Sequence, residues 1–147
     1  MYHHFPGGRS ELILSATRLA GDFITALVED AATDGDPVRA LERFVRFWKY
    51  ALADSDYTAG CPIVALAVDG RHGTDEVAVL VREIFTRWQT SLSGLLVAHG
   101  IPAARARSLA TVVVAAIEGA VILCRAQGDD GPLDDVLTEI PRLLGTP

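Results

Sequence analysis

The sequence is poor in the residues on which several classes of protein depend. It contains one lysine, Lys49, and no run rich in lysine or arginine, while its net charge is −6 and its pI is ≈ 5.1. Such a chain lacks the positive surface with which proteins bind nucleic-acid phosphates or anionic membranes. Residues 2–6 read Tyr-His-His-Phe-Pro and differ from the apolar run of a secretory signal peptide, so we expect a cytoplasmic protein.

Cysteine, histidine and glycine are also sparse, or spaced wrongly for several kinds of site. Cys61 and Cys124 lie in apolar surroundings and are predicted to be reduced, buried thiols. The four histidines form no i, i+4 pair on one helical face, which argues against a metal site. Gly7-Gly8 lacks the following lysine and hydroxyl residue of a phosphate-binding loop. We therefore expect neither a metal ion nor another cofactor.

Apolar segments, by contrast, are abundant, and the most apolar is 102–127. Within 109–124 the only polar side chains are those of Thr111 and Glu118. A helix that is apolar on nearly every side must be covered all round, by lipid or by other helices. The run is shorter than the roughly 20 residues that a bilayer requires, and Glu118 interrupts it. We interpret it as the central helix of a bundle, with a second copy of the chain covering one face.

Apolar residues at three- and four-residue spacing predict further helices on both sides of this one. These helices are predicted at about 10–32, 37–54, 74–99 and 133–144. Asp36 is the expected cap of the second helix, with Pro37 in its first turn. Residues 61–68 have the composition of a strand, but Pro62 and the lack of a partner strand favour a short buried helix. Pro141 is expected to kink or loosen the end of the last helix. The expected fold class is all-α, with about six helices in one domain.

Three strings of the sequence carry a resemblance to a known family. Tyr-His-His-Phe-Pro-Gly-Gly-Arg-Ser-Glu-Leu at 2–12 resembles the family's junction between its DNA-reading helix and the next helix. Gly-Cys-Pro-Ile-Val-Ala-Leu-Ala-Val at 60–68 and Ile-Glu-Gly-Ala-Val-Ile-Leu-Cys-Arg-Ala at 117–126 resemble two helices of its C-terminal domain. The chain thus resembles the tetracycline-repressor (TetR) family of transcription regulators, in the branch with an LmrA/YxaF-type C-terminal domain. The resemblance implies a regulatory domain of about six helices that dimerises through a four-helix bundle of the last two.

Members of this family carry a three-helix DNA-binding domain before the matched region. Residues 1–8 resemble its end, so we expect 1–8 to be a remnant of that domain and 9–147 to be the ligand-binding and dimerisation domain. Tyr2, His3 and His4 match positions that touch the DNA backbone or adjoin it. Without a preceding helix-turn-helix, the chain by itself is expected not to bind operator DNA. The sequence leaves open whether it is a fragment, has a mis-assigned start or is a natural short form.

The resemblance further implies a cavity for an effector, and the residues suit a small lipophilic or aromatic compound. The predicted ligand contacts are Phe23, Phe44, Phe47, Trp48, Cys61, Ala65, Phe85, Trp88, Leu92, Val114 and Glu118. Taken singly, each aromatic side chain fits ordinary core packing better than ligand contact. Glu118 is costly to bury without a partner. It is expected to contact a donor group or cation of the ligand, to pair with Arg82, Arg87 or Arg125, or to reach solvent at a subunit edge.

Small side chains on the central helix permit close approach of another helix, and the resemblance implies that this helix belongs to a second copy. The predicted dimer residues are Leu109, Val112, Val113, Ala116, Ala120, Leu133, Val136, Leu137 and Ile140. The alternative is that these residues make contacts only within one chain.

These features predict the effector-binding and dimerisation domain of a TetR-family regulator, expected to be a repressor. An alternative is an interaction protein that binds no ligand and removes full-length relatives from DNA by dimerising with them. An enzyme built on Glu118 and Cys61 would need a base, a metal ion or an oxyanion donor at a recognisable spacing. The sequence supplies none of these, so we expect no enzymatic activity.

Overall fold

Six α-helices account for most of the residues that the computed structural model describes, which are 8–69 and 75–145. The helices are α1 (Gly8–Ala32), α2 (Pro37–Asp54), α3 (Pro62–Asp69), α4 (Asp75–Ala98), α5 (Ala103–Gln127) and α6 (Gly131–Leu144). The described residues contain no strand, and 61–68, ambiguous in sequence, is helical from Pro62. The predicted all-α class with six helices is confirmed.

Local signals set several of the helix ends. Asp36 caps α2, because its Oδ1 atom accepts hydrogen bonds from the backbone N–H groups of Val38 at 2.8 Å and Arg39 at 3.3 Å. Gly128 ends α5 in the left-handed conformation, with φ of 71°, which glycine adopts without a steric penalty. These two ends lie where the sequence predicts them.

Two other helix ends differ from the prediction or lie at the edge of the described residues. α6 begins at Gly131, before the expected Leu133, and it continues through Pro141 to Leu144. The helix is thus continuous through Pro141 and ends at the predicted residue. The expected start of α4 at Thr74 lies outside the described residues, and α4 is described from Asp75 onward.

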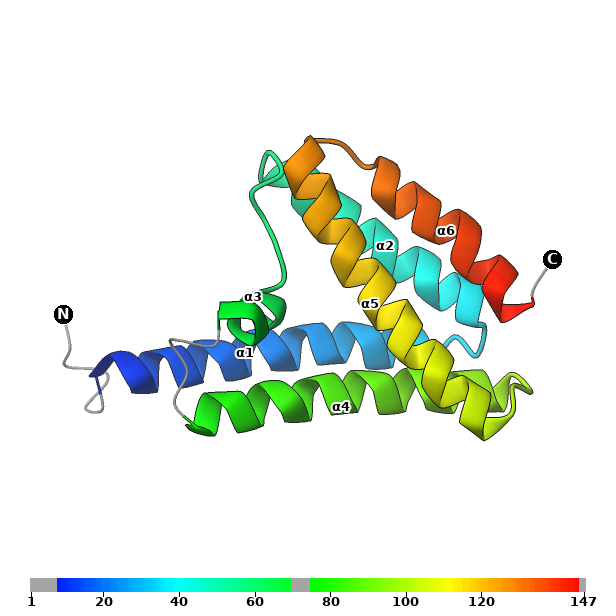
Figure 1. Cartoon of the computed structure of the whole chain (residues 1–147), viewed down its shortest axis with the longest axis horizontal. Helices are drawn as coiled ribbons and strands as arrows, with labels where there is room; N and C mark the ends of the chain where they lie inside the picture. The colour runs from blue at the N-terminus through cyan, green and yellow to red at the C-terminus, as the bar shows by residue number, and fades with distance from the viewer. Residues whose placement is uncertain (1–7, 70–74, 146–147) are drawn as a thin grey trace.

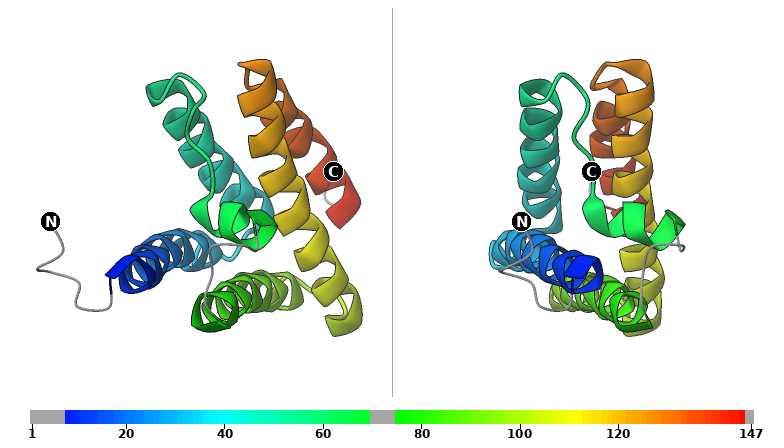
Figure 2. Two further views of the ribbon diagram at one scale, coloured as in Figure 1. Left: turned by 60° about the vertical axis from the view of Figure 1, so that its left-hand side comes forward. Right: turned by 90° about the vertical axis from the view of Figure 1, so that its left-hand side faces the viewer.

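The helices form two layers that cross steeply. α1 and α4 lie side by side and run in the same direction, while α2, α5 and α6 rise from them as a second layer (Figure 1). The view along the first layer in Figure 2 shows α1 and α4 nearly end-on beneath the upright helices. The short α3 packs against both α1 and α4 (Figure 1). The space where the layers cross is filled by side chains from five helices, and it is there that the site described below is formed.

A buried hydrogen bond and a close backbone approach fix α1 against α4. The Trp88 indole Nε1–H donates to the Thr25 hydroxyl at 2.9 Å, and both residues are buried. One turn away, Gly21 leaves room for Ile84, whose side chain occupies the space that a Cβ atom would need. The hydrogen bond satisfies this buried indole N–H and, together with the contact between Gly21 and Ile84, holds α1 on α4.

α5 is the structural centre of the upper layer. By length and composition it is the only described helix apolar enough to cross a membrane. It nevertheless packs along α4 and α6 and supplies core residues from Ala106 to Cys124. Several of its other apolar side chains are exposed, Val112, Ile122 and Leu123 among them. α5 is therefore half covered by its own subunit.

Thr25→Val is expected to lower the free energy of unfolding by about 1–3 kcal/mol, because it leaves the Trp88 N–H buried without an acceptor. Urea unfolding followed by circular dichroism measures the change. Thr25→Ser is the matched control: it keeps the hydroxyl and should lose clearly less. Equal losses in the two variants would show that the hydrogen bond contributes little.

Candidate functional site

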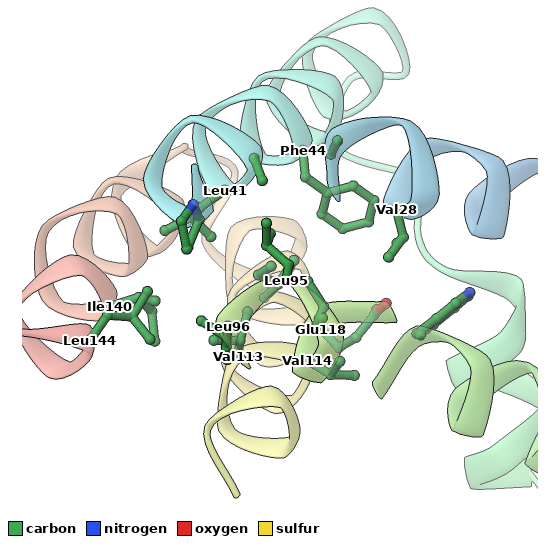
Figure 3. A pocket seen from close by; sticks show the side chains of 16 residues that line it. Val28, Leu41, Phe44, Leu95, Leu96, Val113, Val114, Glu118, Ile140 and Leu144 are labelled. Carbon is green, nitrogen blue, oxygen red and sulfur yellow. The ribbon is translucent and has the colours of Figure 1, made fainter. Parts of the chain in front are cut away.

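An apolar cavity lies where the two layers cross, and we refer to it as the inner cavity. It is lined by Val28, Ala31, Pro37, Ala40, Leu41, Phe44, Trp88, Leu92, Leu95, Leu96, Val113, Val114, Ile117, Glu118, Ile140 and Leu144 (Figure 3). The space open to the centre of a water molecule is ≈ 50 Å³. That is enough for a few waters but well below the roughly 300–1,000 Å³ of a typical ligand site. The cavity is thus nearly filled by the side chains that line it.

Glu118 supplies the only ionisable group of the inner cavity. It lies midway along α5, is 8% exposed, and its carboxyl group stands at the margin of the aliphatic side chains (Figure 3). Burial raises its pKa to about 7, and a hydrogen bond with the Cys61 thiol offsets this only partly. The group therefore changes charge near neutral pH, inside an otherwise apolar wall.

Cys61 is the hydrogen-bonding partner of Glu118, and it stands just before α3. Burial, and secondly the nearby Glu118 charge, raise the pKa of its thiol to about 12. A thiol that stays protonated is a weak nucleophile. Cys124 is also a free, buried thiol, so the prediction of two reduced cysteines is confirmed. The Glu118–Cys61 pair has the character of a structural contact between α5 and α3.

A second hollow lies on the other side of Glu118, and we refer to it as the outer pocket. It is lined by Gly60, Cys61, Val64, Ala65, Val68, Glu118, Val121, Ile122 and Arg125, with a volume of ≈ 190 Å³. The Arg125 side chain lies against Gly60, with a guanidinium nitrogen in the space that a Cβ atom would occupy. Glu118 is the one residue that lines both the inner cavity and the outer pocket.

The structure separates the predicted ligand residues into three groups. Phe44, Trp88, Leu92, Val114 and Glu118 line the inner cavity. Cys61 and Ala65 line the outer pocket together with Glu118. The remaining four, Phe23, Phe47, Trp48 and Phe85, line neither.

These four aromatic residues pack against cavity residues or against one another, outside the cavity. Phe47 and Trp48 contact the Phe44 ring at centroid distances of 6.3 and 6.4 Å, and Phe23 contacts Phe47 at 5.8 Å. Phe85 meets Trp88 edge-on at 5.1 Å. Phe23 is 55% exposed at the outer end of this aromatic cluster. For this group, ordinary packing describes the observed contacts better than ligand contact does.

No cation in the described residues, 8–69 and 75–145, forms an ion pair with Glu118. Arg87, one of the expected partners, instead contacts Glu29 at 3.2 Å and Asp22 at 3.9 Å on α1. Arg125 lines the same pocket as Glu118 without such a contact. Burial rather than ion pairing therefore governs the charge state of Glu118.

A shallow groove between α5 and α6 marks another surface of the chain, which we call the α5–α6 groove. It is lined by Ala115, Ala116, Gly119, Ala120, Leu123, Gln127, Gly131, Pro132, Asp135 and Val136. Of the predicted dimer residues, Ala116, Ala120 and Val136 line it, and Val112, 44% exposed, lies one turn before Ala116. Leu133 is 0% exposed, and Val113 and Ile140 line the inner cavity. Leu109 is buried and Leu137 half-buried.

Sequence reasoning missed most of the aliphatic wall of the inner cavity and the role of Arg125 as a wall of the outer pocket. Leu41, Leu95 and Leu96 lie one turn from predicted residues, Phe44 and Leu92, on the same helix faces. That spacing was the available signal. In the described residues no group of three or more His, Cys, Asp or Glu side chains is placed to hold a metal ion. Tyr2, His3 and His4 lie outside the described residues.

The raised pKa of Glu118 predicts a dependence of stability on pH. Because the folded state holds this proton up to about pH 7, against an ordinary pKa of 4.5, its contribution is full below 4.5 and is lost as pH rises through 7. The free energy of unfolding should fall between pH 5 and 8, by at most on the order of 3 kcal/mol.

Glu118→Gln should flatten this profile and raise stability at pH 8 relative to the unchanged chain. Chemical denaturation across that pH range measures it. Glu83→Gln, an exposed carboxyl on α4, is the control and should keep the original slope. If both variants keep the slope, another group is responsible for it.

Comparisons with known proteins identify the family of the chain. Residues 37–139 match the family described as "Transcriptional regulator LmrA/YxaF-like, C-terminal domain". A helix-turn-helix-type transcriptional regulator of Mycobacterium tuberculosis is 33% identical over 148 residues, covering 97% of this chain and 75% of that protein. The regulator LmrA of Bacillus subtilis is 26% identical over 147 residues, covering 98% and 77%.

A solved structure supports the same conclusion for the fold. The TetR transcriptional regulator of Legionella pneumophila superposes with a TM-score of 0.82 at 20% identity, covering 97% of this chain and 76% of that one. Since the family match extends over more than half of the chain, the assignment does not depend on this fold likeness alone. The chain belongs to the TetR family of transcriptional regulators and carries its LmrA/YxaF-like C-terminal domain.

Proposed function

We propose that this chain is the effector-binding and dimerisation domain of a transcriptional regulator, and that the inner cavity is its effector site. The observation that carries the proposal is the lining of that cavity, which is apolar apart from one buried carboxyl group and the Trp88 indole. Such a wall favours an apolar or aromatic compound, oriented by a single polar contact with Glu118. The indole N–H of Trp88 already donates to Thr25.

The small size of the cavity suggests how binding is communicated. Its walls come from α1, α2, α4, α5 and α6. A ligand larger than ≈ 50 Å³ must separate some of these helices, because a packed interior does not compress. Because the Thr25–Trp88 hydrogen bond holds α1 on α4, the expected response is a movement of these two helices together against α2, α5 and α6. In a regulator that carries a helix-turn-helix, this movement would alter operator binding, most simply as release of a repressor.

The dimer surface that we propose is centred on the α5–α6 groove rather than on the full predicted set. Val112 and Leu123 are 44% and 50% exposed on α5, and small residues of the groove lie between them. An exposed apolar surface with small side chains at its centre suits close packing of two helix pairs in a four-helix bundle. Leu133, Val113 and Ile140 then support the surface from inside the subunit.

One observation favours the alternative of a ligand-free dimerisation partner. The inner cavity is close to filled, as expected of a core that binds nothing. Both the effector-binding domain and the ligand-free partner would take part in the control of transcription, so both fit the cytoplasmic location expected from sequence. They differ in whether an apolar molecule stabilises the chain.

For the effector site, 1-decanol is a suitable uncharged probe. It should raise the unfolding free energy by about 2.7 kcal/mol at 100 times its Kd, seen as a Tm higher by several degrees in a thermal melt. Val114→Phe fills the inner cavity and should abolish this shift. Val79→Phe, at an exposed site on α4, should preserve it. No shift in the unchanged chain across apolar probes would favour the ligand-free alternative.

For the dimer surface, Leu123→Asp should convert a dimer into a folded monomer, because it places charge where two apolar helix pairs meet. Sedimentation velocity at micromolar concentration measures the mass, and circular dichroism checks folding. Val79→Asp, an equally drastic change on α4, should remain dimeric. A monomeric unchanged chain, or a dimeric Leu123→Asp variant, would contradict the proposed surface.

A further inference from the structure

The inner cavity and the outer pocket meet at one residue, Glu118. Glu118 lines both hollows, and the Cys61 thiol meets its carboxyl group from the α3 side. Because Glu118 is the lining residue that the two hollows have in common, movement of its side chain is the step by which they would join. The two spaces are therefore adjacent parts of one potential site.

The combined hollow follows one face of α5. Val114, Glu118 and Arg125 are separated by four and seven residues, so they lie in one row along the helix. From Val114 to Arg125 the row is roughly 16 Å long, at an α-helical rise of about 1.5 Å per residue. Its chemistry changes along its length, from aliphatic side chains at the inner end to a guanidinium group at the outer end.

Arg125 is the cation of this row, and it is available to a ligand. Its guanidinium group lies on Gly60, where a larger residue would displace it. None of the ion pairs within residues 8–69 and 75–145 includes Arg125. The other walls of the outer pocket are mostly aliphatic, from Val64, Ala65, Val68 and Ile122 among others. An unpaired guanidinium group beside an apolar wall suits a carboxylate head that is attached to a hydrocarbon chain.

We propose that the natural ligand is an amphiphilic monocarboxylate that occupies both hollows. Its hydrocarbon chain fills the inner cavity, passes the displaced Glu118–Cys61 pair, and places its carboxylate on Arg125 in the outer pocket. This inference rests on the proposed effector role of the inner cavity and adds the ligand class and the residue that selects it. The distance along α5 favours a straight chain over a compact aromatic compound.

The test compares decanoate with 1-decanol, which has the same chain length and no charge. Isothermal titration calorimetry on the full chain gives Kd for each. Arg125→Gln should raise the Kd of decanoate about tenfold, the loss expected for one charge-assisted hydrogen bond, and should leave that of decanol unchanged. Arg125→Lys should restore part of the affinity. The control Arg107→Gln removes an exposed arginine elsewhere on α5 and should change neither value.

A second variant tests the outer pocket independently of charge. Ala65→Trp fills the pocket from α3 and should weaken decanoate, whereas Ala67→Trp, on the same helix and outside the pocket, should not. Decanoate affinity that is unaffected by Arg125→Gln, or by Ala65→Trp, overturns the proposal. If the unchanged chain binds decanol but not decanoate, the proposed ligand class is also overturned, whereas the proposed effector site is still supported. If the unchanged chain binds neither probe, the effector site fails as well.

Discussion

The burial of α5 is the constraint on which the rest of the structure depends. This helix is apolar around almost its whole circumference, and one subunit offers only α4 and α6 along its length and α2 and α3 at points. The covered face supplies the core and the wall of the inner cavity. The uncovered face carries Val112, Ile122 and Leu123 into solvent. Because one helix serves both faces, a change in packing inside the subunit reaches the proposed dimer surface through a rigid rod rather than through a loop.

The same helix explains why a carboxyl group survives in the interior. Burying Glu118 raises its pKa to about 7, so near neutral pH much of the population carries a proton there and avoids the cost of a buried charge. The Cys61 thiol supplies one hydrogen bond, and no ion pair among the described residues includes Glu118, although Arg125 lines the same pocket. Burial of a carboxyl group costs free energy that an apolar side chain would not. The position of Glu118 between two hollows agrees with the polar role that we propose for it.

The helices were predictable from sequence because they depend on local chemistry. The site was harder to predict because it depends on how the helices cross. Asp36 and Gly128 are recognisable in sequence because capping depends on neighbouring residues. The inner cavity depends on how two layers meet, and a leucine that lines a void looks in sequence like a leucine that fills one. Phe23 was predicted as a ligand contact because it is aromatic, yet the angle between α1 and α2 leaves its ring half exposed. Leu133 shows the reverse: its stripe on α6 turns inward, which periodicity alone cannot distinguish from a stripe facing a partner.

Lys49 ends up at a structural junction. It is the only lysine of the sequence, and its Nζ atom contacts Asp134 at 2.6 Å and Asp130 at 3.8 Å, joining α2 to the start of α6. Tyr57 donates to the same Asp130 carboxylate at 3.1 Å. Acetylation of this one amine would leave two carboxylates facing each other without a cation. A reagent that acylates side-chain amines thus has a single target residue in this chain. A dye attached there would report on the packing of α6 against α2.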